Sequence, residues 1–377
     1  MSNKILKILL FSDLHIGKLN SYISNATSFY ENILNEIFSF KFDKWVFLGD
    51  LVDNVRKKLF VPEINLFITI LSYIDKNLSF ILGNHDLILP SSFNEPELIT
   101  KEPFSYLLKN NKKLQFEYNE NYKTLFISIS YISPFKKEEI YNYIEEQLNI
   151  IKRQNIQVNN IIGFTHLDFE EIFPLVDGFS FDKLSEILHN KFNNANIIFF
   201  NGHYHEKFKY DNQYAKLIGI GSCLINENPL SPNSITNNEI PSIVILKISD
   251  NKVSYDFYSL ESALLYITFN TSSYKDLSQV LQYKNPLLLQ YKDTIINYDL
   301  VNELLKKPNV ANVILKKQYI NNDNDDILIE QTQKSNEEDI YIVTDKIIKE
   351  KIKNYLSKNE NLNDKMKKRI EDLINKT

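Results

Sequence analysis

Hydrophobic residues along the first part of the chain alternate between strand-like runs and helix-like spacings. Apolar runs at residues 5–11, 45–48 and 78–82 predict strands, whereas residues 22–40 place apolar side chains three and four positions apart, which predicts a helix. A second helix is expected to begin at Pro62, because proline suits the first turn of a helix. The predicted order is β-α-β-α-β, and a polar motif follows each strand.

The pattern continues beyond the third strand. Residues 88–118 contain three prolines and are expected to form loops, and a helix is expected from Pro134. Further apolar runs predict strands at 125–131, 161–164 and 197–200. Three later runs are expected to be hairpin-connected strands that close a second sheet, namely 217–220, 243–248 and 253–258. This first domain is expected to end near residue 260.

The C-terminal third has a different composition. Strand-like runs at 264–269, 287–291 and 313–317, with a helix at 298–305, predict a smaller unit. A polar stretch at 321–339 predicts a flexible acidic linker, and no EF-hand spacing follows its cluster Asp323–Asp326. The last segment, residues 340–377, has the spacing of two short amphipathic helices. Helices this short need another surface: a partner protein, each other, or a second copy of the chain.

Composition limits the class of protein. With 377 residues and 43% hydrophobic residues the chain can form a sizeable core. A formal net charge of −5 gives no general support for nucleic-acid binding, although it is compatible with a local basic groove. The single cysteine, Cys223, excludes an internal disulfide and fits a reducing compartment. No stretch approaches the roughly 20 apolar residues of a membrane span, so a cytoplasmic protein without a membrane segment is expected.

The candidate chemistry lies at the ends of the predicted strands. Five of the six histidines occur there; the sixth, His189, lies in a predicted helix. Side chains that follow neighbouring strands of an open α/β sheet converge on one crevice. Oxygen and imidazole ligands without a thiolate suit Mn, Fe, Zn or Ni rather than Ca. The polar strand-end residues are Asp13, His15, Asp50, Asp53, Asn84, His85, Asp86, His166, His203 and His205.

The number of candidate ligands favours two metal ions over one. Seven or more ligands are too many for one tetrahedral zinc, but they fill two sites that share a bridging carboxylate. Asp50 is the expected bridge, since it follows a central strand. His85 would then be free to act on the leaving oxygen, with Asp86 orienting its ring. Asp53 either supports the site or caps the following helix. The implied chemistry is metal-assisted hydrolysis of a phosphoester.

The order of these motifs resembles that of the calcineurin-like metallophosphoesterases. The blocks are Asp13-Leu-His15, Gly-Asp50-Leu-Val-Asp53, Gly-Asn84-His85-Asp86, His166 and Gly-His203-Tyr-His205. The resemblance implies an α/β fold, an αββα sandwich of two mixed sheets. It further implies that Asp13, His15, Asp50 and His205 hold one metal, that Asp50, Asn84, His166 and His203 hold the other, and that His85 is catalytic without being a ligand.

The chain as a whole is similar to the SbcD-type nuclease subunits, and among them to the T-even phage recombination endonuclease subunits. The likeness rests on Gly17 after His15, on Gly219-Ile-Gly221-Ser222, and on the order of the segments. It implies a nuclease domain at 1–260, a small α+β capping domain that binds DNA at 261–320, a linker at 321–339 and a helical segment at 340–377.

The same resemblance implies cofactors and partners. These are two Mn²⁺ ions, with Mg²⁺ or another divalent metal as substitutes, double-stranded DNA, a second copy of the chain, and an SMC-like coiled-coil ATPase of the SbcC type bound through residues 340–377. The implied activity is exonuclease and endonuclease cleavage during repair or recombination of DNA breaks. Phosphate contacts are expected from Lys18, Lys57, Lys136 and Lys137, although each of them could equally lie on a solvated face.

Other functions share the same core chemistry. A protein phosphatase usually has Arg-Gly after the second block, where this chain has Asn54-Val55, and Glu where it has Asp86. A phosphodiesterase for small molecules, or a subunit that serves mainly assembly, is a further alternative. The chain also lacks the Arg/Lys-Gly-Phe turn that usually follows Gly221-Ser222 in the SbcD-type subunits.

Overall fold

The computed structural model describes these residues of the chain: 5–23, 26–53, 66, 70, 78–88, 98–99, 114–174, 177–225, 230–232, 235, 240–249, 252–292 and 297–315. Of the helix predicted from Pro62, only Leu66 and Ile70 are described; both are helical and buried. Lys57, the predicted linker and the predicted helices of residues 340–377 lie outside the described residues.

The first sheet has five strands in the order β13-β12-β1-β2-β3. Strands β1, β2 and β3 are mutually parallel, and β12 pairs antiparallel with both β1 and β13. Helix α1 (Ala26–Ser39) connects β1 to β2. The strand bounds are Leu6–Phe11 (β1), Lys44–Leu48 (β2), Leu78–Ile81 (β3), Ser242–Ser249 (β12) and Lys252–Ser259 (β13).

The second sheet has six strands in the order β10-β11-β9-β8-β7-β6. Its four central strands are parallel and both edge strands are antiparallel. Helices α4 (Lys137–Arg153) and α5 (Phe181–Lys191) connect its parallel strands. The strand bounds are Leu114–Asn119 (β6), Thr124–Ile129 (β7), Asn160–Thr165 (β8), Asn196–Asn201 (β9), Lys207–Asp211 (β10) and Ala215–Ile220 (β11).

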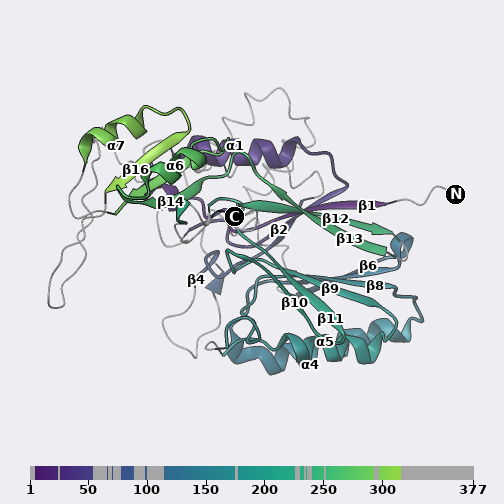
Figure 1. The fold of residues 1–377 in the computed structure, drawn as a ribbon. Helices are drawn as coiled ribbons and strands as arrows, with labels where there is room; N and C mark the ends of the chain where they lie inside the picture. The colour runs from purple at the N-terminus through teal and green to yellow at the C-terminus, as the bar shows by residue number, and fades with distance from the viewer. Residues whose placement is uncertain are drawn as a thin grey trace, which may run out of the picture.

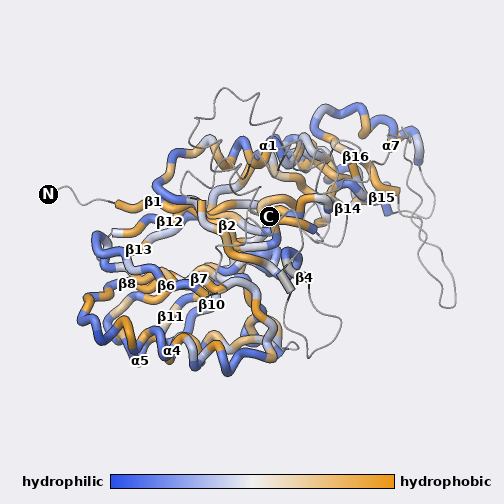
Figure 2. The backbone as a smooth tube through the Cα atoms, turned by 180° about the vertical axis from the view of Figure 1, so that it is seen from behind, coloured by the Kyte–Doolittle hydropathy of each residue, from blue (hydrophilic) through white to orange (hydrophobic). Residues whose placement is uncertain are grey.

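The alternation of side chains in each strand stacks the two sheets face to face. In β1, Ile8 and Leu10 belong to the core between the sheets, whereas Leu9 and Phe11 pack on the side of α1. The second sheet packs its other face against α4 and α5. Figure 1 shows the resulting layers, with α1 above and the helices α4 and α5 below. In Figure 2 hydrophobic colour follows β1 and β2 inside the stack. The predicted αββα sandwich of two mixed sheets is confirmed.

Three predicted details are wrong. The hairpin β12–β13 extends the first sheet instead of closing the second one with β11. Strand β6 lies in a region predicted to be loop, and β10 was not predicted. Strands β6 and β10 are edge strands with half-exposed side chains, so their hydrophobic pattern is weak.

A three-stranded parallel sheet, in the order β14-β15-β16, follows the sandwich. It packs with two helices around its own hydrophobic core, and Glu36 of α1 accepts hydrogen bonds from the backbone N–H of Glu261 (3.1 Å) and Ser262 (2.9 Å) beside it. The elements are β14 (Leu265–Phe269), α6 (Tyr274–Val280), β15 (Leu287–Tyr291), α7 (Tyr298–Leu305) and β16 (Val310–Leu315). A separate pair, β4 (Leu87–Ile88) and β5 (Leu98–Ile99), is antiparallel.

Two further features bear on the later sections. Cys223 is completely buried, and its backbone N–H donates to the carbonyl of Ser12 at 3.1 Å. Among the helices of the described residues, none combines the length and the apolar character needed to cross a membrane.

Candidate metal centre

The loops after β1 and β2 run side by side and bring the first ligands together. Backbone N–H groups of Asp13 and His15 donate to the carbonyls of Gly49 (3.0 Å) and Asp50 (3.0 Å), so the parallel pairing continues beyond the strands. Asp13, His15 and Asp50 have φ angles of 56°, 43° and 59°, in the left-handed region that few non-glycine residues adopt. The side chains of Asp13, His15 and Asp50 gather in one cluster at this point.

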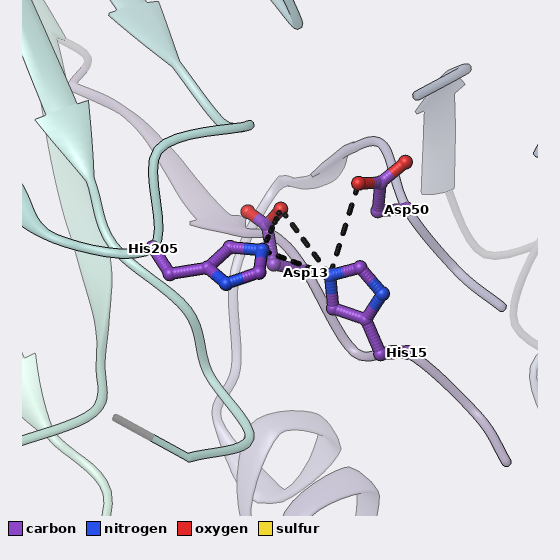
Figure 3. A group of neighbouring side chains, drawn as sticks. All are labelled: Asp13, His15, Asp50 and His205. Carbon is purple, nitrogen blue, oxygen red and sulfur yellow. Dashed lines mark hydrogen bonds and ion pairs between the residues drawn. The ribbon is translucent and has the colours of Figure 1, made fainter. Parts of the chain in front are cut away.

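A first group of candidate ligands, called the first ligand group, consists of Asp13, His15, Asp50 and His205 (Figure 3). His205 Nε2 lies 3.3 Å from Asp13 Oδ1 and 2.9 Å from His15 Nε2. His15 Nε2 lies 3.7 Å from Asp50 Oδ2. Both carboxylate oxygens of Asp13 are buried and make no hydrogen bond. Their contacts with the rings of His15 (3.8 Å) and His205 (3.3 Å) are ion-pair distances only, a costly arrangement that a cation would relieve. The donor set therefore fits a divalent metal ion.

A second ligand group consists of Asp50, His166 and His203, with the amide oxygen of Asn84 between the rings. His166 Nδ1 donates to the carbonyl of Leu48 (2.6 Å), so its Nε2 faces Asp50 Oδ2 at 3.2 Å and Asn84 Oδ1 at 3.2 Å. His203 Nδ1 lies 3.1 Å from Asn84 Oδ1. Asp50 is thus the residue that the two groups share, as a bridging carboxylate must be.

Burial and neighbouring charge set the protonation of this centre. Burial lowers the pKa of His15 to about 4, which keeps the ring neutral and able to donate a lone pair at neutral pH. Burial alone would raise the pKa of Asp50, but the adjacent His166 imidazole holds it well below its usual range. Burial opposes a charged His166, yet Asp50 raises the pKa of that ring to about 9. Asp50 therefore stays ionised and available as a ligand.

Two glycines allow the loops to approach this closely. A Cβ atom on Gly49, whose φ is 94°, would lie 2.4 Å from His166 Nδ1, and one on Gly83 would lie 2.0 Å from Asp50 Oδ1. Any larger residue at either position would displace a predicted ligand.

His85 lies at the edge of the centre rather than inside either ligand group. Its ring is 4.9 Å from that of His15, and its Nδ1 contacts the backbone carbonyl of Asp53. The carboxylate of Asp53 gathers with His15 and His85 in a third cluster. Asp53 thus lies beside His85, whereas the start of the helix that it was predicted to cap lies outside the described residues.

Asp86 has a different role from the predicted one. Its carboxylate accepts hydrogen bonds from the backbone N–H groups of Asp50 (2.9 Å), Leu51 (2.9 Å), Val52 (3.3 Å) and Gly83 (2.9 Å). The carbonyl of Asp53, and not Asp86, orients the ring of His85. Asp86 instead joins the turn after β2 to the turn after β3, because those turns expose N–H groups that only a buried acceptor can satisfy.

Two further residues organise the centre and were not predicted. The carboxylate of Asp168 lies 2.6 Å from His203 Nε2. The side chain of Asn201 accepts from Leu167 N–H (3.0 Å) and donates to its carbonyl (3.1 Å), which ties the loop after β8 to the end of β9. Asp168 follows His166 by two residues and the end of the buried strand β8 by three, and this position is the signal that could have identified it.

The predicted lysine contacts differ in their surroundings. Burial is the main cause of the lowered pKa of His15, and the positive charge of nearby Lys18 is a smaller cause in the same direction. Lys136 is exposed. Lys137 donates to the carboxylate of Asp177 at 2.5 Å and to the carbonyl of Gly178 at 3.3 Å, so its charge is already paired.

Comparison with known proteins identifies the family. The family model described as calcineurin-like phosphoesterase matches residues 6–207, more than half of the chain and all of the residues gathered above. The comparison with curated proteins yields no match.

Several solved structures are similar. A predicted phosphoesterase from Streptococcus pneumoniae TIGR4 is 12% identical over 68% of this chain and 90% of its own, with a TM-score of 0.31. A dimetal phosphatase from Danio rerio is 10% identical over 67% and 99%, with a TM-score of 0.39. A 5′-nucleotidase from Candida albicans SC5314 is 12% identical over 72% and 52%, with a TM-score of 0.39. On the family match over residues 6–207, the chain belongs to the calcineurin-like phosphoesterase family, whose members use a dinuclear metal centre.

Proposed function

We propose that the protein is a manganese-dependent nuclease that hydrolyses phosphodiester bonds of DNA at a two-metal centre. The observation that carries the hydrolytic part is the shared position of Asp50 in both ligand groups. Two divalent ions bound there would polarise the phosphate and activate a water molecule. Asp13, His15 and His205 would hold one ion, and Asn84, His166 and His203 the other.

His85 is suited to proton transfer. Its Nδ1 faces the carbonyl of Asp53, so this nitrogen carries the proton in the neutral ring and Nε2 is left for the substrate. In the protonated ring, Nε2 donates a proton to the leaving oxygen as the phosphodiester bond breaks. The carbonyl holds the ring in one orientation during this transfer.

DNA as the substrate is supported by the order of motifs shared with the SbcD-type subunits and by the small unit beside α1. Strands β14, β15 and β16 form a parallel sheet that follows the phosphoesterase core in the chain and lies beside α1, which agrees with the order of segments expected from the resemblance. We propose that residues 261–320 bind double-stranded DNA and that the protein acts as a dimer. The native metal is proposed to be Mn²⁺.

The decisive experiment compares two substrates. The purified protein is incubated with Mn²⁺ or Mg²⁺ and either linear double-stranded DNA or bis(p-nitrophenyl) phosphate. We expect DNA degradation with Mn²⁺, and His85→Asn should lower kcat about 10²- to 10⁴-fold while Mn²⁺ affinity is kept. His189→Asn is the matched control, since His189 stacks on Tyr214 (4.7 Å between ring centroids) outside the centre.

Two results would contradict the proposed function. Hydrolysis of the small ester without DNA cleavage, in the presence or absence of an SbcC-type ATPase, would contradict the nuclease proposal and favour a small-molecule phosphodiesterase. An unchanged rate in His85→Asn would contradict the role given to His85.

Residues 340–377 are proposed to bind the coiled-coil ATPase. The support is the helical spacing of their apolar residues behind the predicted linker. A chain lacking residues 340–377 should lose binding to an SbcC-type ATPase in a pull-down and keep hydrolysis of the small ester. Retained binding would contradict the assignment.

A further inference from the structure

Both ring nitrogens of His203 lie close to an oxygen atom. Its Nε2 lies 2.6 Å from Asp168 Oδ1, and its Nδ1 lies 3.1 Å from the amide oxygen of Asn84. The ionised carboxylate of Asp168 can only accept a hydrogen bond, so Nε2 must carry the proton. In the neutral ring this leaves the lone pair of Nδ1 directed at the second ligand group.

The other histidine of this group is arranged in the opposite sense. His166 donates from Nδ1 to the carbonyl of Leu48 (2.6 Å) and presents Nε2 to Asp50 and Asn84. Its hydrogen-bond partner is a neutral carbonyl, whereas the partner of His203 is a charged carboxylate. A carboxylate behind an imidazole ligand fixes the tautomer and also makes the ligand more basic.

Asp168 is fixed by the loop that carries it. Its backbone carbonyl accepts from Phe179 N–H at 2.8 Å, and the following residue, Phe169, donates its N–H to the hydroxyl of Tyr204 at 2.7 Å. Tyr204 directly follows His203. The loop after β8 is therefore bonded to the turn that carries His203, and the carboxylate and the ring keep their relative position.

We propose that Asp168 is a positioning residue that sets the affinity of the second metal site by holding His203 as an Nδ1 ligand. The inference rests on the proposed two-metal centre. Asp168 should affect the second metal site alone. Its hydrogen-bond partner His203 belongs to the second ligand group, and among the described residues the first ligand group contains no hydrogen-bond partner of Asp168.

The test is a titration of the full-length, metal-free protein with Mn²⁺, followed by calorimetry and by the electron paramagnetic resonance signal of free Mn²⁺. The unchanged protein should bind two ions. Asp168→Asn should weaken one of them about tenfold to a hundredfold and leave the other within twofold. Nitrogen NMR of the ring should show the Nε2–H tautomer of His203 in the unchanged metal-free protein and a mixture in the variant.

Matched variants separate a local from a general effect. Asp177→Asn removes an exposed carboxylate near the same loop, paired with Lys137, and should leave both sites unchanged. Adding Asp168→Asn to His203→Ala should cause no further loss, because the ring through which Asp168 acts is gone. If Asp168→Asn does not fold, Asp168→Glu, which keeps the acceptor, provides the comparison.

The outcomes distinguish this inference from the function. If the unchanged protein binds two ions and Asp168→Asn binds both with the same affinity, the inference is wrong and the two-metal proposal stands. Equal weakening of both sites would also contradict it, since that indicates a general loss of negative charge. If the unchanged protein binds no divalent ion, the proposed function itself fails.

Discussion

Four predicted ligands of this centre lie on strained backbone. Asp13, His15, Asp50 and His203 all have positive φ, with values from 43° to 70°. Such conformations cost about 1–3 kcal/mol each and persist only where surrounding contacts impose them. Here the hydrogen bonds between the loops after β1 and β2 impose the conformation on three of the four. The ligand positions are thus fixed by the main chain before any ion binds.

Replacing Gly49 tests how closely the backbone of the loop after β2 packs against the ring of His166. Gly49→Ala and Gly221→Ala both place an alanine at positive φ, but only the Cβ at Gly49 would lie 2.4 Å from His166 Nδ1; that at Gly221 finds its nearest atom at 3.3 Å. We expect Gly221→Ala to lower the free energy of unfolding by about 1–2 kcal/mol. Gly49→Ala should lower it by about 1–3 kcal/mol more, since the ring must move.

Urea unfolding and Mn²⁺ titration of both variants provide the measurement. Gly49→Ala should also weaken Mn²⁺ binding, whereas Gly221→Ala should not. Equal losses of stability with unchanged binding in both would show that the contact with His166 is not tight.

At the scale of elements, Asp86 joins the ends of two strands. Asp86→Asn replaces one accepting oxygen by an NH₂ group and leaves two of the four backbone N–H groups without an acceptor. Each unsatisfied buried donor costs about 1–3 kcal/mol, so the loss of two should lower the free energy of unfolding by about 2–6 kcal/mol. Urea unfolding measures this loss.

Asp256→Asn is the control for Asp86→Asn, because Asp256 forms an exposed pair with Lys247 and its replacement should change stability by less than about 0.5 kcal/mol. If Asp86→Asn left stability intact and reduced only kcat, Asp86 would serve His85 after all.

Much of the element order could be predicted from the sequence, because buried strands such as β2 and β8 are continuous apolar runs that end at polar motifs. Strand pairing could not. Strands β12 and β13 alternate in the same way whichever sheet they join, and the choice depends on the pairing of β12 with β1, more than 230 residues away.

The same limit applies to the site. Residue type and position after a strand were enough to find the residues that gather here, such as Asp13 and His203. They were not enough to find the hydrogen-bond partners, since Asp86 binds backbone N–H groups and His85 faces a backbone carbonyl, and no sequence motif encodes either contact.

At the scale of the whole molecule, metal removal should destabilise the fold. The ligands come from loops of both sheets, so bound ions would join the two halves of the sandwich. At a concentration one hundred times Kd, each ion adds about 2.7 kcal/mol to the free energy of unfolding. EDTA should therefore lower Tm by roughly 5–10 °C relative to excess Mn²⁺. Differential scanning calorimetry measures this shift.

Asp50→Ala serves as the control for metal removal, because it deletes the carboxylate that both ligand groups share. Its Tm should respond little to EDTA. A Tm of the unchanged protein that is the same in EDTA and in Mn²⁺ would contradict metal binding at this centre.

The buried Cys223 can report how often the segment beside the metal centre opens. Burial, with the nearby Asp13 carboxylate, raises the pKa of its thiol well above the usual range, so the closed protein should not react with a thiol reagent at pH 8. Reaction requires the segment beside Ser12 and Asp13 to open. As this is the only cysteine in the chain, the labelling rate counts openings at one place, and Mn²⁺ should slow it. A rate that is fast and insensitive to Mn²⁺ would mean that this part of the molecule opens independently of its ligands.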